Sequence, residues 1–376
     1  NISSHTWIAN QRLTWKNLQD YFHSNEDAYL SEMEATDRKG PGSLELKPRM
    51  QLPEHVSHQI HIQPGGYVGD PFAGHMYHYG TNSFYLGGRG HNDQDQIHRC
   101  VANNLPLPKD GKVRRILDYG CGIGQFSLAL KERFPDAEVW GLDIGGPMIR
   151  YGHMRASHLK YDVNFVQRLA EDNGFPDGYF DLVTSYIAHH EMPADVSRQV
   201  IAEVQRTTRP GAIYYPIDFI TGGSEMIPRY MFGRWWDHRW NNERWSFEYH
   251  AMDFAAEIEA RGFNKAADPK SVIRGFGIRH YIWAEGDSGP ADVATSHGNV
   301  RRVPGAARRL NPQRLRKRAL QVSDSAGDCG NRSLGEFRRP AAIAGRGHCP
   351  GVPRTGTDSG GFQAGLTRLR PPQVRV

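Results

Sequence analysis

The chain has 376 residues, 38% of them hydrophobic, and a formal net charge of +5 that is distributed unevenly. Residues 287–376 contain 15 Arg and one Lys against six Asp and Glu, a net charge of +10, so the preceding residues carry −5. This distribution argues against a nucleic-acid-binding domain, because the part of the chain that holds nearly all aromatic residues is mildly acidic. We therefore expect only non-specific nucleic-acid contacts, made by the basic terminal segment.

Membrane and redox signals point to a cytoplasmic protein. No run of about 18 apolar residues occurs, so we expect no membrane span. None of the four cysteines forms a CxxC motif. We therefore expect the default for such a chain, a reducing compartment. The oligomeric state cannot be inferred from the sequence.

Residues 1–105 are rich in aromatic residues, His and Gly, and prolines interrupt any long periodicity. The pattern predicts short helices at 14–22 and 93–101, joined by loops. We expect this region to form a helical and irregular cap that covers the substrate.

From residue 114 onward, short apolar runs alternate with amphipathic stretches. This alternation predicts an α/β fold over residues 106–286: a doubly wound, Rossmann-like, mostly parallel seven-stranded sheet. Strands are predicted at 115–119, 138–144, 164–167, 180–186, 212–219 and 277–284, with helices directly after residue 124 and at 147–159, 194–207 and 253–260.

The segment 287–376 has a different composition. Gly and Pro make up 21 of its 90 residues, and Phe337 and Phe362 are its only aromatic residues, so it lacks the apolar surface to order itself. We predict disorder. The Arg, Gly and Pro content is typical of GC-rich DNA read out of frame, which favours a frameshifted or read-through terminus over a functional basic arm.

The first predicted strand is followed by Gly120, Gly122 and Gly124. In a doubly wound sheet the first turn between strand and helix lies next to the ligand, and glycines allow its backbone a close approach. Asp143 ends the second strand, where a carboxylate can accept hydrogen bonds from both ribose hydroxyls. The last glycine of a dinucleotide-binding G-x-G-x-x-G turn is replaced by Gln125, so we predict a nucleoside ligand other than NAD.

Four segments, in order, resemble motifs of class I S-adenosylmethionine-dependent methyltransferases. They are residues 116–124 (ILDYGCGIG), 139–143 (VWGLD), 175–183 (FPDGYFDLV) and 209–211 (RPG). The resemblance covers residues 75–285. It implies that S-adenosyl-L-methionine is the cofactor and that its methyl group moves, by in-line displacement, to an O, N or C atom of a small-molecule acceptor.

The resemblance also implies cofactor contacts. Asp118 and the backbone of Gly120, Gly122 and Gly124 would hold the methionine moiety, Asp143 the ribose and Ile144 the adenine. The Ala170 backbone and either Glu171 or Asp172 would also contact the adenine, and Ser185 would add a further contact. Residues 77–85 resemble the segment that covers the cofactor in cyclopropane-synthase-like and tocopherol-methyltransferase-like members, although Gly80 replaces the usual Asp. Tyr79 would close over the sulfonium there, or the aromatic residues of this segment simply pack in the core.

The acceptor should lie beside residues 186–193 (YIAHHEMP), which follow the fourth predicted strand. His190 and His189 are the catalytic candidates, because a histidine with a pKa near neutral can take a proton from the acceptor. A capping role for His190 is the alternative. Residues 222–252 combine aromatic residues with Asp237 and Glu243 and would form an aromatic lid over the acceptor.

The histidines at 55, 58 and 61 are evenly spaced, but we expect no metal site. Pro53 and Pro64 interrupt a helix there, and nothing suggests the Cys or carboxylate partners of a closed structural site. Two other functions remain open: cyclopropane-synthase-like lipid modification with the same cofactor, or a non-catalytic module that binds S-adenosylmethionine.

Overall fold

The computed structural model describes residues 2–84, 93–221, 228–267, 278–280 and 282–285. The predicted disordered segment, 287–376, lies outside the described residues, as do residues 222–227 of the predicted aromatic lid. The division into a cap at 1–105 and a domain at 106–286 stays a prediction.

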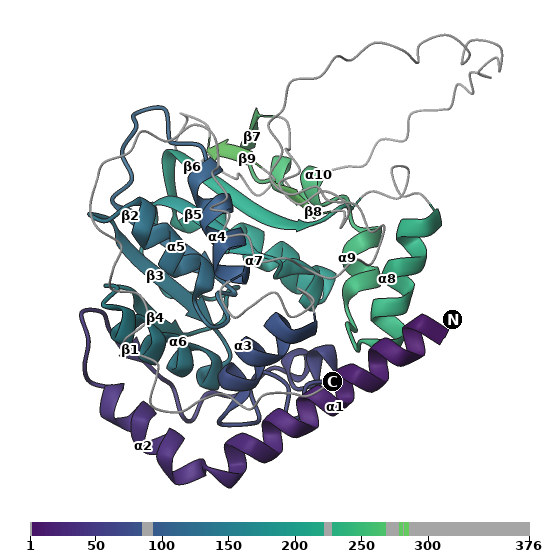
Figure 1. The fold of residues 1–376 in the computed structure, drawn as a ribbon. Helices are drawn as coiled ribbons and strands as arrows, with labels where there is room; N and C mark the ends of the chain where they lie inside the picture. Colours follow the sequence, from purple (N-terminus) through teal and green to yellow (C-terminus); the bar gives the residue numbers. More distant parts are fainter. Residues whose placement is uncertain (1, 85–92, 222–227, 268–277, 281, 286–376) are drawn as a thin grey trace, which may run out of the picture. The chain divides into compact units, whose positions relative to one another are not determined.

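A mostly parallel sheet forms the centre of the described fold (Figure 1). Its strand order is β1-β4-β3-β2-β5-β6-β9-β7, with β8 also pairing with β6. The strands from β1 to β6 in this order are parallel, whereas β8 and β9 run antiparallel to β6, and β7 runs antiparallel to β9. The strands are β1 (Leu44–Glu45), β2 (Arg115–Tyr119), β3 (Glu138–Asp143), β4 (Asn164–Gln167), β5 (Phe180–Tyr186), β6 (Thr208–Phe219), β7 (Phe263–Ala267), β8 (Ile278–His280) and β9 (Ile282–Glu285).

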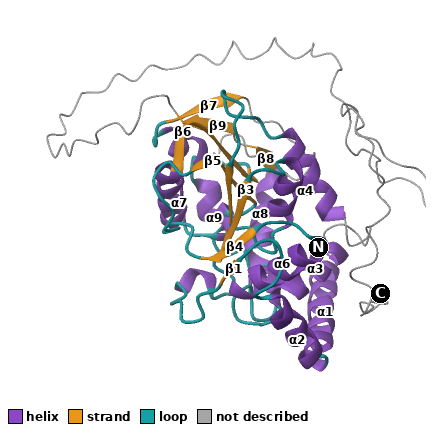
Figure 2. Ribbon diagram, turned by 90° about the vertical axis from the view of Figure 1, so that its left-hand side faces the viewer, coloured by secondary structure: helices purple, strands orange, loops and turns teal. Residues whose placement is uncertain are grey.

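Helices cover both faces of the sheet (Figures 1 and 2). Neighbouring residues of a strand point to opposite faces: Ile116 packs on the side of α4, α5 and α6, and Leu117 on the side of α7, α9 and α10. The helices are α1 (Ile2–Ser24), α2 (Glu26–Thr36), α3 (Ala73–Phe84), α4 (Asp93–Asn104), α5 (Gln125–Arg133), α6 (Gly146–Leu159), α7 (Ala194–Thr207), α8 (Pro228–Trp240), α9 (Ser246–Ala251) and α10 (Phe254–Glu259), with short 3₁₀ turns η1 (Glu54–Val56), η2 (Ile60–Ile62) and η3 (His189–Glu191).

The predicted fold class is confirmed, and several elements match residue for residue. Strands 115–119, 164–167 and 180–186 and helix 194–207 have the predicted bounds. The described residues form a sheet of nine strands rather than the predicted seven. The two-residue β1 adds an edge strand, and the last predicted strand is divided into β8 and β9 on either side of residue 281.

The N-terminal region is more helical than predicted. The helix expected at 14–22 is the 23-residue α1, and α2 and α3 were not predicted. The three helices pack with α6 around a shared core that includes Trp15, Phe22 and Tyr151. Contacts with the sheet domain therefore stabilise these helices, and a local sequence pattern does not reveal such contacts.

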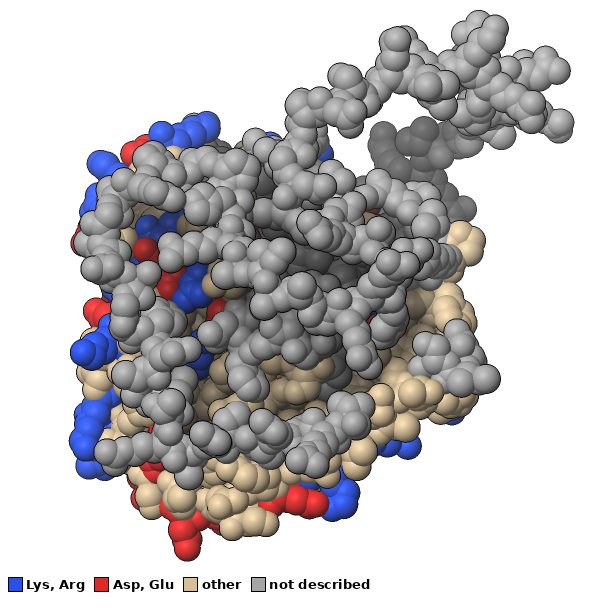
Figure 3. Space-filling view, viewed as in Figure 1, with Lys and Arg blue, Asp and Glu red and all other residues tan. Residues whose placement is uncertain are grey.

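On the face seen in Figure 3, the visible Lys and Arg side chains of the described residues lie among Asp and Glu side chains. None of the described helices is both long enough and apolar enough to cross a membrane.

Gly80 tests the packing of α3 on α1. A Cβ atom added at Gly80 would overlap the ring of Trp15, which is 1% exposed. Gly80→Ala should therefore cost about 1–3 kcal/mol of unfolding free energy, despite the higher helix propensity of alanine. Urea denaturation measures this. Gly233→Ala, in α8 with open space around it, is the control and should stabilise by up to about 1 kcal/mol; equal effects would contradict the packing.

Candidate functional site

The turn after β2 depends on its glycines. Gly120, Gly122 and Gly124 have φ values of 61°, 53° and 72°, a left-handed conformation that other residues rarely adopt. A Cβ atom at Gly120 would also lie 2.8 Å from the Cβ atom of Ala188, in the segment after β5. The turn therefore brings its backbone directly against the segment that carries the predicted catalytic histidines.

Asp143 ties this turn to the end of β3. Its Oδ2 accepts a hydrogen bond from the Gly122 N–H at 2.8 Å, and its Oδ1 accepts one from the Gly145 N–H at 2.7 Å. Burial raises the pKa of Asp143, and the hydrogen bonds from Gly145 and Gly122 oppose that rise. Each carboxylate oxygen has a second lone pair, so both oxygens can also accept a hydrogen bond from a ligand.

Asp118, near the end of β2, is fully buried below the turn. Its Oδ2 accepts a hydrogen bond from the Ser127 hydroxyl at 2.6 Å, whereas its Oδ1 has no partner among the described residues. Burial raises the pKa of Asp118 to about 7. An unpartnered buried carboxylate oxygen is costly, so its place in the wall of a cavity indicates a ligand that donates a hydrogen bond.

A cavity of about 520 Å³ opens between the glycine turn and the histidine segment. This volume lies within the usual range for small-molecule sites. Asp118, Gly122 and Asp143 form part of its wall on one side, and His190 lies on the wall as well. Much of the remaining wall is apolar and comes from Val56, Ile60, Ile97, Phe126, Met148, Met192 and Val196.

The two adjacent histidines have different surroundings. His190 is 1% exposed, lies on the cavity wall, and its Nδ1 is hydrogen-bonded to Asp218 Oδ1 at 2.9 Å. Burial lowers its pKa, but Asp218 outweighs this effect and the pKa rises to about 9. His189 is fully buried, and its two ring nitrogens are hydrogen-bonded to the Ser197 and Tyr119 hydroxyls, both at 2.7 Å. Burial lowers the pKa of His189 to about 4, with Asp218 opposing.

A family model described as a methyltransferase domain matches residues 116–211, which include the turn, Asp143 and the histidine segment. Over these residues the chain is similar to a methyltransferase domain. The predicted resemblance to methyltransferases is therefore confirmed for this segment, and the match agrees with S-adenosylmethionine as the predicted cofactor.

Curated relatives match part of the chain. Demethylmenaquinone methyltransferase of Thermus thermophilus is 36% identical over 121 residues, 32% of this chain and 53% of that protein. Fatty-acid O-methyltransferase of Mycolicibacterium smegmatis is 33% identical over 48% of this chain and 62% of that protein. A probable tocopherol O-methyltransferase of Oryza sativa subsp. japonica is 32% identical over 37% of this chain and 39% of that protein. The chain thus spans about half the length of these relatives.

Most of the predicted site residues lie on the wall of the cavity, and four do not. On the wall lie Asp118, Gly120, Gly122, Asp143, Ile144, Ala170, Glu171 and His190. The cavity wall does not include Gly124, Tyr79, Ser185 or His189.

Helical geometry explains the position of Tyr79. The segment predicted to cover the cofactor is part of α3, where residues two apart point in nearly opposite directions. Tyr77 therefore lines the cavity, while Tyr79 packs toward Phe22 with ring centroids 5.8 Å apart. Along β5, Tyr186 lines the cavity and its neighbour Ser185 does not.

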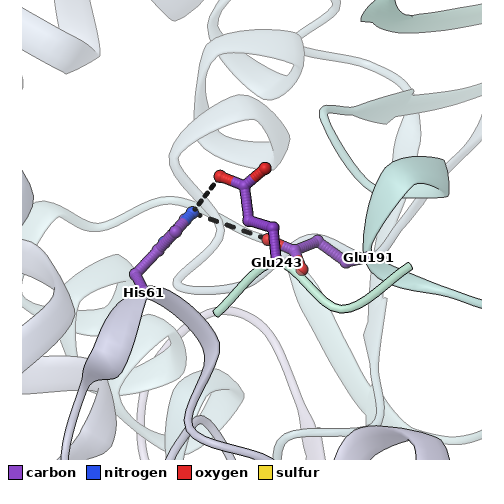
Figure 4. Close-up of side chains that lie close together, drawn as sticks. All are labelled: His61, Glu191 and Glu243. Atoms are coloured by element: carbon purple, nitrogen blue, oxygen red, sulfur yellow. Dashed lines mark hydrogen bonds and ion pairs between the residues drawn. The ribbon is translucent and has the colours of Figure 1, made fainter. Parts of the chain in front are cut away.

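A charged part of the cavity wall was only partly predicted. His61, Glu191 and Glu243 come from three separate segments and meet at this wall (Figure 4). Glu243 falls in the predicted aromatic lid and Glu191 in the predicted acceptor segment, but His61 is one of the three histidines for which the sequence predicts no metal site. Its even spacing with His55 and His58 was the only available signal, and the contact with Glu243 spans 182 positions of sequence.

The buried carboxyl group of Asp118 predicts a pH-dependent stability difference. Its pKa of about 7 lies above its ordinary value, so its contribution to stability is present at low pH and is lost as the pH rises through 7. Asp118→Asn stays neutral. Relative to wild type, the variant should therefore gain on the order of 2–3 kcal/mol of unfolding free energy between pH 5 and pH 8.

Urea denaturation of the ligand-free proteins at several pH values measures this difference. Asp136→Asn, in an exposed turn, is the control and should follow wild type throughout. A constant difference between Asp118→Asn and wild type across this range would show that Asp118 is charged in the folded protein.

Proposed function

We propose that this chain transfers the methyl group of S-adenosylmethionine to a small lipophilic molecule. One observation carries the proposal: a single cavity joins the glycine turn and its two aspartates to His190 and an apolar wall. The names of the relatives, which include quinone, fatty-acid and tocopherol methyltransferases, support an acceptor of this kind. The cytoplasmic location expected from the sequence stays a prediction.

The cofactor would be held by the residues around the turn. Asp143 would accept hydrogen bonds from the ribose hydroxyls, and Asp118 Oδ1 would accept one from the methionine moiety. The backbone of Gly120 and Gly122 would line the same moiety. Ile144, with Ala170 and Glu171, would contact the adenine. Tyr77 and Tyr186, which line the cavity, would take the places predicted for Tyr79 and Ser185.

Bound S-adenosylmethionine supplies an electrophilic methyl group on a positively charged sulfur. The acceptor atom forms a bond to the methyl carbon as the carbon–sulfur bond breaks, which leaves S-adenosylhomocysteine. The protein contributes mainly by holding the acceptor atom in line with that bond and by excluding water. When the acceptor loses a proton, the neutral form of His190 would receive it, because Asp218 orients the ring and makes the imidazole a stronger base. The pKa of about 9, rather than the near-neutral value expected from the sequence, makes this neutral form the minor one at pH 7 and the major one only above pH 9.

Labelled methyl transfer tests the proposed function. With S-adenosylmethionine labelled at the methyl group and a lipid extract, the full chain should place label in organic-phase products. Asp143→Ala should lower the affinity for S-adenosylhomocysteine about 5–150-fold, the equivalent of ~1–3 kcal/mol. Calorimetry measures this affinity, with Asp136→Ala as the control. Tight cofactor binding without label in any extract would instead indicate a non-catalytic module, and tighter binding of NAD would contradict the cofactor assignment.

His190 is tested separately. His190→Ala should reduce turnover about 10²–10⁴-fold while leaving the affinity for S-adenosylhomocysteine unchanged. His190→Gln can still hydrogen-bond but cannot take a proton at neutral pH, so it should be equally slow. A loss of less than tenfold in the alanine variant would contradict the role as a base. Recovery of most activity by glutamine would make His190 a positioning residue.

A further inference from the structure

Three side chains that bind metals in many proteins converge on one point of the cavity wall (Figure 4). His61 is contributed by η2, Glu191 by η3, and Glu243 by the segment between α8 and α9. His61 Nε2 lies 3.2 Å from Glu243 Oε1 and 3.5 Å from Glu191 Oε1. The three donor atoms all lie within 4.8 Å of one another.

This spacing suits a bound divalent cation. Metal–ligand bonds from imidazole nitrogen and carboxylate oxygen are about 2.0–2.2 Å long. In tetrahedral or octahedral geometry, neighbouring donor atoms are then about 3.0–3.5 Å apart. The two distances from His61 Nε2 fall at this separation, so the side chains need little movement to coordinate an ion.

The carboxylates also have oxygens with no partner among the described residues. Glu243 is 4% exposed, and its Oε2 is buried without a hydrogen bond, as is Oε2 of Glu191. Buried carboxylate oxygens are normally paired or coordinate a metal. Two carboxylates this close also repel each other unless positive charge lies nearby. His190 Nε2, 3.6 Å from Glu191 Oε1, supplies part of that charge, and a divalent cation between the carboxylates would supply more.

The histidine is held in the orientation that coordination needs. The Tyr67 hydroxyl is hydrogen-bonded to His61 Nδ1 at 2.9 Å, which directs Nε2 toward the two carboxylates. Metal-binding histidines usually have such a partner on the other ring nitrogen. The backbone carbonyl of His61 accepts hydrogen bonds from the Gln11 and Trp15 side chains, both at 2.8 Å, so α1 fixes the position of this residue.

We propose that His61, Glu191 and Glu243 bind one divalent transition-metal ion, such as Mn²⁺ or Zn²⁺. Three protein ligands leave coordination positions open toward the cavity. Resting on the proposed function, the ion binds an oxygen atom of the methyl acceptor, which selects a hydroxyl- or carboxylate-bearing molecule. It also lowers the pKa of a bound hydroxyl group. Glu191 directly follows His190, so such an oxygen lies beside the proposed base.

Metal binding can be measured without cofactor or acceptor. The full chain, treated with a chelator and then titrated with Mn²⁺, Zn²⁺ or Co²⁺, should bind one ion per chain by calorimetry and show Co²⁺ absorption bands. Glu191→Gln and Glu243→Gln should each weaken binding at least tenfold. Glu259→Gln, the same change at an exposed site in α10, should leave it unchanged.

The outcomes separate the ion from an internal ion pair. A protonated His61 between two carboxylates is the competing arrangement; it predicts no stoichiometric binding by folded wild-type protein, and that result would overturn the proposal. Binding that persists in both glutamine variants would overturn it as well. Thermal midpoints show whether the variants are folded. If the ion binds but its removal leaves methyl transfer unchanged, the acceptor role is wrong. If no acceptor is methylated, the proposed function fails while the metal site stands.

Discussion

The two hydrogen bonds accepted by the Asp143 carboxylate hold the ligand-facing end of the sheet together. They join the left-handed turn after β2 to the chain that leaves β3, at Gly122 and Gly145. On its other side the turn approaches Ala188, in the segment after β5, so closely that a side chain at Gly120 would not fit. The result is a surface of turn backbone and two carboxylates held by internal hydrogen bonds, and preorganised surfaces of this kind lower the entropic cost of binding a ligand.

The opposite part of the cavity is assembled from segments that are distant in sequence. Helix α1 positions His61, the segment after β5 contributes His190 and Glu191, and the segment between α8 and α9 adds Glu243. Charged groups buried so closely are costly unless they balance one another or bind an ion. Such a cluster beside apolar walls is suited to orient one polar group of a lipophilic molecule.

Sequence patterns predicted the sheet domain well because its signals are local. Strand β5 and helix α7 have matching bounds, and the glycine turn is dictated by backbone conformation at three neighbouring residues. The N-terminal helices were predicted incompletely because their stability comes from packing on α6. Tyr79 does not line the cavity because its segment is helical, and the sequence analysis did not predict that helix.

The charged wall was the least predictable part of the site. His61 lies in a short 3₁₀ turn, and its partners are 130 and 182 positions away. Only the tertiary structure brings these side chains together, since each has an ordinary local explanation as a loop or surface residue. Long-range pairs of this kind leave no periodic pattern for a single sequence to show.

A crystal structure of the full chain with S-adenosylhomocysteine tests the central claim most directly. The account predicts that the ribose hydroxyls contact Asp143, that the methionine moiety contacts Asp118, and that the sulfur faces the part of the cavity lined by His190. Binding of the ligand elsewhere, or with its sulfur turned away from His190, would contradict the assignment of this cavity to methyl transfer.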